Sequence, residues 1–265
     1  MLLLNRSKRK LLLATFSLGL VAACGSGKND DFDDRTGVAN PRLRVVHAAT
    51  GIGSLNFLRN GQIDIDGNAA DYLYGSQYHD VGSGSNSLSL TRGNINTEFG
   101  KSTFDASRGH KYTAAAVIYA SGVDLVIIDD PFNKSLVSDN ARLRVFNSAA
   151  NVRQVDTYLT AAGRNWITDP ATFAATGFGA ASPASGEGSL ELERGTYQLR
   201  LTEPGSRTVL FSASLELPKN ADWTLFMLAE SEAALLAGQN KLRVLLLRSD
   251  DSADATDELV NQPLP

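Results

Sequence analysis

The chain contains one short sequence twice, and this repetition restricts its fold more than any other feature. Residues 42–49 read Arg-Leu-Arg-Val-Val-His-Ala-Ala, and residues 142–149 read Arg-Leu-Arg-Val-Phe-Asn-Ser-Ala, the same pattern 100 positions later (142 − 42). At the start of both copies polar and apolar residues alternate with the period of two that is typical of a half-buried β-strand. The sequence therefore predicts a duplicated unit that begins with a strand.

The segments that follow the two copies also correspond. Apolar strands are predicted in the first copy at 55–58, 88–91, 112–119 and 123–128, and in the second at 155–159, 199–202, 223–228 and 242–247. The offset between them grows to 111 at Tyr112 and Trp223 (223 − 112). We therefore expect insertions of about eleven residues in loops of the second copy, where extra length costs little.

Local signals predict the remaining elements. Strands at 72–75 and 98–104 complete the first copy, and an Asn60-Gly61 turn closes its second strand. A helical turn at 231–236 is predicted only in the second copy. Short strands about ten residues apart, with turn residues between them, indicate antiparallel β-sandwiches.

We therefore predict an all-β chain with two tandem sandwich domains at residues 41–134 and 139–250, followed by a polar tail at 251–265. Each domain is expected to bury its own core, because each copy has its own set of apolar strands.

The linker between the domains carries three apolar residues that a solvated linker has little reason to contain: Phe132, Leu136 and Val137. We expect these side chains to pack at the junction, so that the two domains form a semi-rigid rod.

Residues 1–23 have the three parts of an export signal. Basic residues at 6–10 precede an apolar run at 11–20, which is short for a membrane span, and a small-residue cleavage site follows at 21–23. Cys24 comes next and is the only cysteine of the chain, so it cannot form an internal disulfide. Its position favours acylation, while an ordinary signal peptide followed by a chance cysteine is the alternative.

The sequence Val21-Ala-Ala-Cys24 resembles the lipobox of bacterial lipoproteins. This resemblance implies a palmitate-type lipid anchor on Cys24 and, because Gly25 is not Asp, a location at the outer membrane, facing the periplasm or the surface. Residues 24–40 are then the lipidated cysteine and a flexible polar tether, roughly 55 Å long when extended. We expect the aspartates of this tether to be solvated, because a flexible acidic run binds calcium poorly.

Charge limits the expected partners. Without residues 1–23 the chain has 21 Lys and Arg against 29 Asp and Glu, a formal charge of −8, and no basic cluster remains. This balance disfavours nucleic acid, which needs a clustered positive surface. The expected partners are the membrane, through the lipid anchor, and another envelope protein or a glycan.

The motifs of known chemistry are incomplete. Gly100-Lys101-Ser102 ends like a phosphate-binding loop, but Ile95 stands where glycine is required. The segment 64–68 resembles a calcium loop, but Gly75 occupies the twelfth position, so a turn is the better interpretation. The histidines, His47, His79 and His110, lack the spacing of metal ligands. We therefore predict no metal, no cofactor and no catalytic residue.

Four aromatic residues lie near loops or predicted strand ends: Tyr72, Tyr74, Tyr78 and Phe132. They are candidates for a stacking surface that faces a glycan or a peptide, and the alternative is that they pack inside the domains.

The combination of these segments resembles the DUF4397 family. The resemblance rests on Arg-Leu-Arg-Val-Val-His-Ala, a Tyr-Gly or Phe-Gly step, Lys-Tyr-Thr or Asp-Trp-Thr before a hydrophobic strand, and Val-Ile-Ile-Asp-Asp. It covers about residues 41–131 and 141–249. It implies immunoglobulin-like or transthyretin-like sandwiches on a bacterial envelope, and no site residue, since Asn147 replaces His47 in the second copy.

Two functions are compatible with this sequence. The first is a non-catalytic envelope lipoprotein whose domains act as a spacer or as an interaction module. The second is a hydrolase of envelope glycan or peptide, which predicts a cleft between the repeats lined by at least two carboxylates. Asp129 and Asp130 alone are a poor pair for it, because neighbours on a strand point to opposite faces. The first function is favoured.

Overall fold

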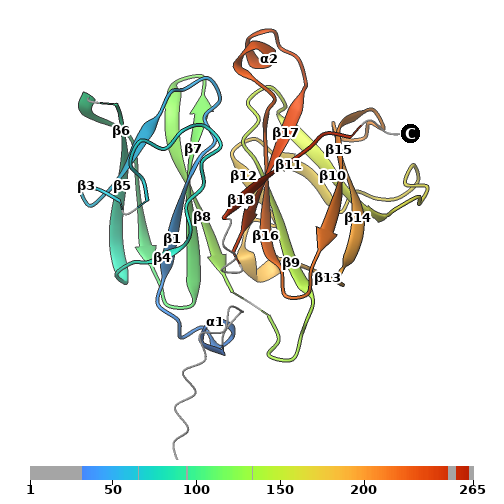
Figure 1. Cartoon of the computed structure of the whole chain (residues 1–265), viewed down its shortest axis with the longest axis horizontal. Helices are drawn as coiled ribbons and strands as arrows, with labels where there is room; N and C mark the ends of the chain where they lie inside the picture. Colours follow the sequence, from blue (N-terminus) through green and yellow to red (C-terminus); the bar gives the residue numbers. More distant parts are fainter. Residues whose placement is uncertain (1–31, 65, 94, 133, 250–254, 263–265) are drawn as a thin grey trace, which may run out of the picture.

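A computed structural model of the chain describes residues 32–64, 66–93, 95–132, 134–249 and 255–262 (Figure 1). The predicted signal peptide and Cys24 lie outside these ranges. The described residues form mainly β-strands, with two short α-helices, α1 (Phe32–Thr36) and α2 (Glu232–Leu236), so the all-β prediction is confirmed. Within these ranges, no helix combines the length and the apolar character needed to cross a membrane.

The first repeat consists of two sheets with a hydrophobic core between them. Its strands are β1 (Arg42–His47), β2 (Leu55–Arg59), β3 (Gln62–Ile63), β4 (His79–Asp80), β5 (Gly84–Arg92), β6 (Ile95–Ala106), β7 (His110–Tyr119) and β8 (Gly122–Pro131). One sheet has the order β4-β1-β7-β8 and the other β3-β2-β5-β6. Alternate residues such as Leu43, Phe57 and Leu90 point between the sheets and are fully buried.

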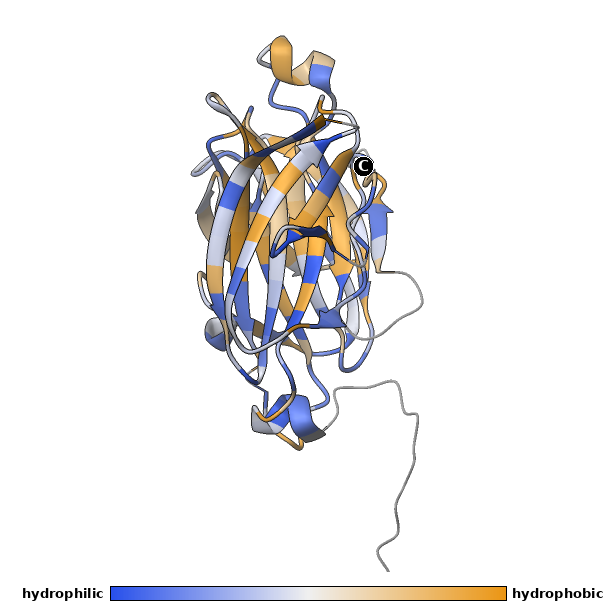
Figure 2. Cartoon of the chain, turned by 90° about the vertical axis from the view of Figure 1, so that its left-hand side faces the viewer, coloured by the Kyte–Doolittle hydropathy of each residue, from blue (hydrophilic) through white to orange (hydrophobic). Residues whose placement is uncertain are grey.

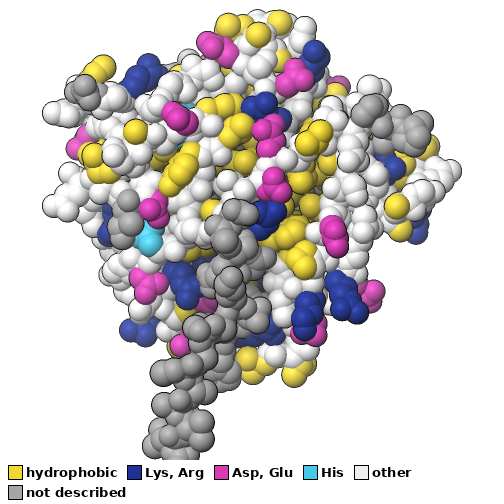
Figure 3. All heavy atoms as spheres, in the orientation of Figure 1, with side chains coloured by type: hydrophobic (Ala, Val, Ile, Leu, Met, Phe, Trp, Pro, Cys, Tyr) yellow, Lys and Arg dark blue, Asp and Glu magenta, His cyan; other side chains and the backbone are white. Residues whose placement is uncertain are grey.

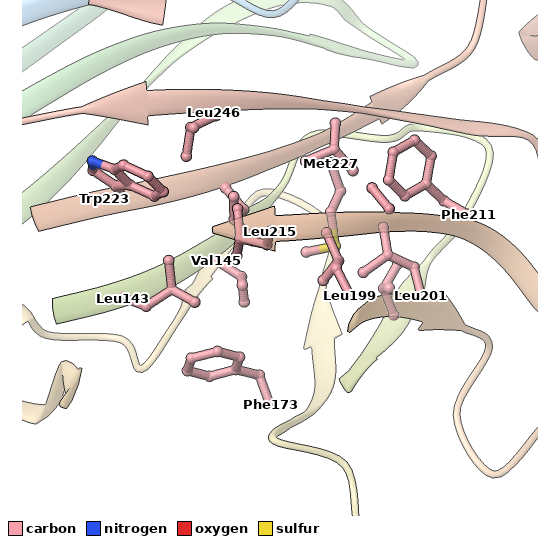
Figure 4. Close-up of a cluster of buried hydrophobic side chains, with 14 of the residues drawn as sticks. Leu143, Val145, Phe173, Leu199, Leu201, Phe211, Leu215, Trp223, Met227 and Leu246 are labelled. Atoms are coloured by element: carbon pink, nitrogen blue, oxygen red, sulfur yellow. The ribbon is translucent and has the colours of Figure 1, made fainter. Parts of the chain in front are cut away.

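The second repeat has the same plan with additional short strands. Its elements are β9 (Ala141–Asn147), β10 (Gln154–Ala161), β11 (Phe173–Gly177), β12 (Ala180–Ser182), the 3-10 turn η1 (Gly186–Gly188), β13 (Leu190–Leu192), β14 (Gly195–Thr202), β15 (Val209–Leu217), β16 (Asp222–Ala229), β17 (Leu242–Arg248) and β18 (Thr256–Leu259). The sheet β12-β9-β16-β17-β18, with β13 also paired to β9, faces the sheet β11-β10-β14-β15. Figure 4 shows their shared core, in which Leu143, Trp223 and Leu246 meet Leu199 and Leu215.

The four sheets stack as four layers (Figure 1). We call the two middle layers, which contain β1 and β9, the central sheets, and the other two the outer sheets. The central sheets pack on each other through fully buried side chains, among them Val46 and Ala115 of the first repeat and Phe146 and Phe226 of the second. The repeats therefore lie side by side and bury a third apolar cluster between them.

This arrangement corrects the prediction that the repeated strand is half-buried. Leu43 faces the core of its own repeat, while Arg44 on the opposite face is 1% exposed because the second repeat covers it. Arg142 and Arg144 are buried in the same way. An alternating pattern distinguishes the two faces of a strand, but it does not show whether water or another sheet covers the polar face.

Equivalent residues of the two repeats make reciprocal contacts at this junction. In the first central sheet Tyr112 pairs with Leu43 and Asp129, and in the second Trp223 pairs with Leu143 and Arg248. Asp129 and Arg248 are thus equivalent positions. Arg44 Nη1 donates to the carbonyl oxygen of Arg248 and Arg144 Nη1 to that of Asp129, both at 3.1 Å. The junction therefore has the approximate two-fold character of an isologous dimer interface.

Two further expectations about the first repeat and the linker are wrong in part. Residues 72–75 form a turn, in which Leu73 has a φ of 73°, and only Gly75 bridges to β1. In the linker Phe132 is 6% exposed, but Leu136 and Val137 are 56% and 91% exposed. The contact between the central sheets, and not the linker, orders the repeats, and they form a side-by-side pair instead of a rod.

The chain ends of the folded part are held more firmly than expected. In α1, Arg35 Nη1 donates to the carbonyl oxygens of Ser135 (2.7 Å) and Ser138 (3.1 Å), so the last part of the predicted tether is fixed to the linker. The predicted tail contributes β18, and the backbone amide of Gln262 donates to Ser212 of β15. The predicted helical turn is confirmed as α2, and the Ser231 hydroxyl caps it by accepting from the Ala234 amide.

Candidate binding site

A polar groove lies on the outer sheet of the first repeat, on the face that points away from the second repeat. It has a volume of about 600 Å³, within the usual range of ligand sites. We call it the outer groove. Its lining residues are Asn56, Leu58, Gly61, Ile63, Asn68, Ala69, Thr91, Gly93, Asn96 and Glu98. Figure 2 views the molecule from this side and shows hydrophilic, intermediate and hydrophobic residues following one another along the facing strands.

The period of β2 places two residues in the floor of the groove. Leu55 and Phe57 point into the core, so Asn56 and Leu58 face outward. Asn56 Nδ2 donates to Thr91 Oγ1 (3.2 Å) and to the carbonyl oxygen of Gly93 (3.1 Å). Asn56 Oδ1 accepts from the backbone amide of Ala69 (2.8 Å). The Asn56 side chain thus links three parts that surround the groove: the loop at Ala69, strand β5 at Thr91 and the β5–β6 hairpin at Gly93. These links fix the shape of the groove.

The rim of the groove carries exposed polar side chains. Asn68 and Asn96 contribute amides, and Glu98 contributes a carboxylate that lies 3.3 Å from Lys101 Nζ. Ile63 is an exposed apolar side chain at the edge formed by β3. The groove therefore combines neutral hydrogen-bonding groups, one carboxylate and a small apolar surface.

The second repeat has an equivalent of this floor. Asp156 pairs with Thr202 as Asn56 pairs with Thr91. Asp156 Oδ1 accepts from the backbone amide of Ala175 (2.7 Å), as Asn56 Oδ1 does from Ala69. Ala69 and Ala175 also share an unusual positive φ, 48° and 47°. These shared features identify the same structural position in both repeats.

In the second repeat the chain itself covers this face. Trp166, from the loop between β10 and β11, packs edge-on against Tyr158 with ring centroids 5.0 Å apart and is 8% exposed. The guanidinium carbons of Arg200 and Arg207 lie 5.2 and 5.3 Å from the Trp166 ring centroid. Ala175 follows Asp156 by 19 positions, whereas Ala69 follows Asn56 by 13, so this repeat has six residues more here than the first. Part of the expected insertion therefore closes the face that stays open in the first repeat.

The four candidate aromatic residues do not form one surface. The Tyr72 hydroxyl donates to the carbonyl oxygen of Ala229 at the junction (3.2 Å), and Tyr74 packs against the core of the first repeat. The ring centroid of Tyr78 lies 4.6 Å from the guanidinium carbon of Arg44. Phe132 contacts the buried cations of Lys111 and Arg142, 4.9 and 4.5 Å from its centroid. These positions agree with the alternative that the four aromatic side chains pack inside the protein.

Acidic residues do converge between the repeats, but they are buried in ion pairs. We call this group the junction cluster: Asp34, Lys111, Asp130, Arg142 and Asp222. Arg142 Nη2 lies 2.8 Å from Asp130 and Nη1 3.2 Å from Asp222, while Lys111 Nζ is 3.5 Å from both Asp34 and Asp222. All five residues are at most 6% exposed. Removing one partner of such a buried pair is costly, and none of the three carboxylates of this cluster lies at the surface of a cleft.

Burial and neighbouring charge act in opposite directions on this cluster. Burial alone would raise the pKa of Asp222, but the cations of Arg142 and Lys111 outweigh burial and lower it. Burial alone would lower the pKa of Lys111, but the carboxylates of Asp222 and Asp34 outweigh burial and raise it. Both residues therefore stay charged at neutral pH.

Asp129, the neighbour of Asp130 on β8, points away from the junction and lies 2.7 Å from His110 Nδ1. The two acids thus face opposite sides, as expected for adjacent residues on a strand.

The three histidines lie apart. His47 is fully buried, where its Nε2 is 3.1 Å from the carbonyl oxygen of Gly53 and its Nδ1 accepts from the Ala49 amide, and burial lowers its pKa. Asn147 makes the equivalent contacts, accepting from the Ala149 amide and donating to the carbonyl oxygen of Val152. His47 and Asn147 are therefore different side chains that make equivalent contacts in the two copies.

His79 lies 3.1 Å from Asp64, which also accepts from Arg59 Nε (3.1 Å). The carbonyl oxygen of Asp64 accepts from the Gly67 amide. In the part of the chain that the structure describes, no group of three or more His, Cys, Asp or Glu side chains could hold a metal ion.

Sequence reasoning missed both the outer groove and the residues that close its counterpart. The groove depends on a cross-strand partnership, Asn56 with Thr91, that no local pattern reveals. One signal was available for the second repeat, because Trp166 lies within the predicted insertion, where a solvated loop has little use for a tryptophan.

Comparison with known proteins gives a match to a family model. Residues 41–158 match the model of the family described as Domain of unknown function (DUF4397), which confirms the resemblance for this part of the chain. A solved structure titled "Alpha-glucan binding by a streptococcal virulence factor" aligns with 77% of this chain and 96% of its own, at 10% identity and a TM-score of 0.24. A similarity this low carries no argument. A comparison with curated proteins gave no match.

Proposed function

We propose that this chain is a non-catalytic interaction module of the bacterial cell envelope, held at the outer membrane by a lipid on Cys24, and that the outer groove binds its ligand. One observation carries the proposal: the same face of the fold is open in the first repeat and closed by Trp166 in the second. A face that is covered in one copy and recessed in the other is a reasonable place for a ligand.

The position of α1 supports this arrangement. It lies at one end of the molecule and contacts the linker, so the anchor leaves the folded part from that end (Figure 1). Cys24 is eight residues before Phe32, so the chain between them can span at most roughly 27 Å. The folded part would therefore stay close to the membrane and carry the groove on its side.

The acidic side chains have few signs of a catalytic role. On the face seen in Figure 3 they are interspersed with basic side chains. The acids that gather between the repeats are committed to ion pairs of the junction cluster. This commitment of the junction acids supports binding over catalysis.

Co-sedimentation tests this function. The mature chain with Cys24→Ser would be mixed with isolated peptidoglycan sacculi and with outer-membrane vesicles. We expect it to sediment with one of them, and Asn96→Arg combined with Asn68→Arg to reduce the bound fraction at least about tenfold. Thr103→Arg, at an exposed position of the same strand β6 outside the groove, is the matched control. Equal sedimentation of the groove variant and the control would refute the groove as the site.

The anchor has its own test. Cys24→Ser in the full chain should move the protein from the membrane fraction to the soluble fraction and abolish labelling by a fatty-acid analogue. Retention of the variant in membranes, with no label on the native protein, would show that Cys24 is not the anchor.

A further inference from the structure

We propose that the ligand of the outer groove is a neutral sugar ring of a glycan, which lies where Trp166 lies in the second repeat. This inference rests on the proposed function, because it assigns a ligand class to the same groove. It is argued from the differences between two equivalent faces of one chain.

The second repeat shows which groups hold an aromatic ring on this face. Trp166 lies edge-on to Tyr158 and close to the guanidinium groups of Arg200 and Arg207. Aromatic edges and guanidinium groups are the side chains that recognise a π system. Arg200 is fixed in turn by donating to Thr160 Oγ1 at 2.8 Å.

The first repeat lacks these groups at the equivalent positions. Leu58 pairs with Ser89 as Tyr158 pairs with Arg200, so leucine replaces tyrosine and serine replaces arginine. No aromatic residue, lysine or arginine belongs to the described lining of the groove. The groove is therefore suited neither to an aromatic ring nor to an anion.

The groups that the groove does offer match a pyranose. Leu58 and Ile63 provide an apolar surface for the C–H face of a sugar ring. Thr91 accepts from Asn56 through its oxygen, which leaves its O–H as a donor. The amides of Asn68 and Asn96 can donate and accept, and the carboxylate of Glu98 accepts from hydroxyl groups. Because Asn56 already fixes the floor, little ordering is needed when the ring binds.

The volume of the groove also limits the ligand. About 600 Å³ lies in the middle of the range for ligands of drug-like size, so a short oligosaccharide fits better than a folded partner.

Calorimetry with defined probes tests the ligand class. The mature chain with Cys24→Ser would be titrated with neutral oligosaccharides of glucose and of N-acetylglucosamine, with an oligogalacturonate as the anionic probe, and with a tryptophan-containing peptide as the aromatic probe. We expect at least one neutral oligosaccharide to bind at least about tenfold more tightly than the anionic and aromatic probes.

Two variants link this binding to the groove. Asn96→Ala with Glu98→Gln removes rim contacts, and Leu58→Tyr with Ser89→Arg gives the floor the groups of the second repeat. Both should weaken binding of the neutral oligosaccharide at least about tenfold, and the second should improve binding of the aromatic probe. Thr103→Ala serves as the control, and thermal melts verify that all variants fold.

The outcomes separate the two proposals. Tighter binding of the anionic or aromatic probe to the native chain, or no binding of any neutral oligosaccharide, would overturn the sugar assignment. If sedimentation with envelope fractions still depended on Asn68 and Asn96, the proposed function would survive that result. Neutral sugar binding that is unchanged in both groove variants would overturn the assignment of the sugar to this groove.

Discussion

The two repeats share a fold but differ in what they do with the same positions. In the first repeat Asn56 holds an open groove, and in the second Asp156 holds a loop whose Trp166 covers the equivalent face. His47 and Asn147 differ in chemistry but fill one structural role. The comparison teaches that the duplication kept the positions that build the fold and changed those that decide access to the surface.

The two repeats also differ at a pair of equivalent charged positions in the junction. Lys111 pairs in register with Arg42, and Asp222 with Arg142, so Lys111 and Asp222 occupy equivalent strand positions. Their charged groups lie 3.5 Å apart. In a symmetric dimer one residue type would occupy both positions, whereas in this chain the two copies have opposite charges that attract each other.

The largest expected effect is a difference in stability loss between substitutions at two equivalent arginines, Arg142 and Arg42. Arg142→Ala leaves Asp130 and Asp222 buried without their main partner and should cost about 3–5 kcal/mol of unfolding free energy. Arg42→Ala removes a side chain that is 21% exposed and lies 3.5 Å or more from its acids, which should cost at most about 1 kcal/mol. Urea denaturation measures both, and equal costs would show that the two positions are not buried differently.

The linker offers the next contrast. Phe132→Ala removes a buried ring that covers Lys111 and Arg142 and should cost about 3 kcal/mol. Val137→Ala, at a highly exposed position five residues later, should change stability by less than about 0.5 kcal/mol. Thermal melts of both variants test this, and a large loss in Val137→Ala would restore the original expectation for the linker.

Opening the closed face should have a smaller effect. Trp166→Ala removes the cover of Tyr158 but leaves the core of the second repeat intact, so we expect a loss of about 2 kcal/mol, below the about 3–5 kcal/mol typical of a core tryptophan. The variant should also acquire a groove, detected as increased binding of free indole. An unchanged melt and no indole binding would mean that the loop does not cover this face.

The smallest effect concerns pH. Burial lowers the folded-state pKa of His47 below its ordinary value of 6.5, so the unfolded chain binds more protons between the two values. The native protein therefore loses stability as the pH falls from about 6.5 towards the folded-state pKa. His47→Asn copies the second repeat and should cost less than about 1 kcal/mol at pH 7.5.

Melts of the native protein and this variant between pH 7.5 and 5.5 check the sign, since the two proteins differ only at residue 47. Parallel curves for the two proteins would show that His47 does not contribute to the pH dependence.

The sequence was most informative about the strands and least informative about what covers them. Apolar runs located β2, β7 and β17, and a period of two located β1 and β9. The same pattern misassigned Arg44, because burial by a second sheet depends on the arrangement of the repeats. Lys111 and Asp222 were a signal that the sequence did contain. They occupy equivalent positions in the two copies and carry opposite charges, which indicates a contact between the copies. The outer groove had no such signal, since Asn56 and Thr91 meet only through strand pairing.

The central claim is that the repeats bury a common interface formed by their central sheets. A protease site placed within residues 134–138, where Leu136 and Val137 are exposed, allows the chain to be cut after folding, with the uncut protein as control. Size-exclusion chromatography should then show both fragments in one peak at the position of the uncut chain, because Val46, Phe146 and the junction cluster hold them together. Two separate peaks, each containing one independently folded repeat, would contradict the account.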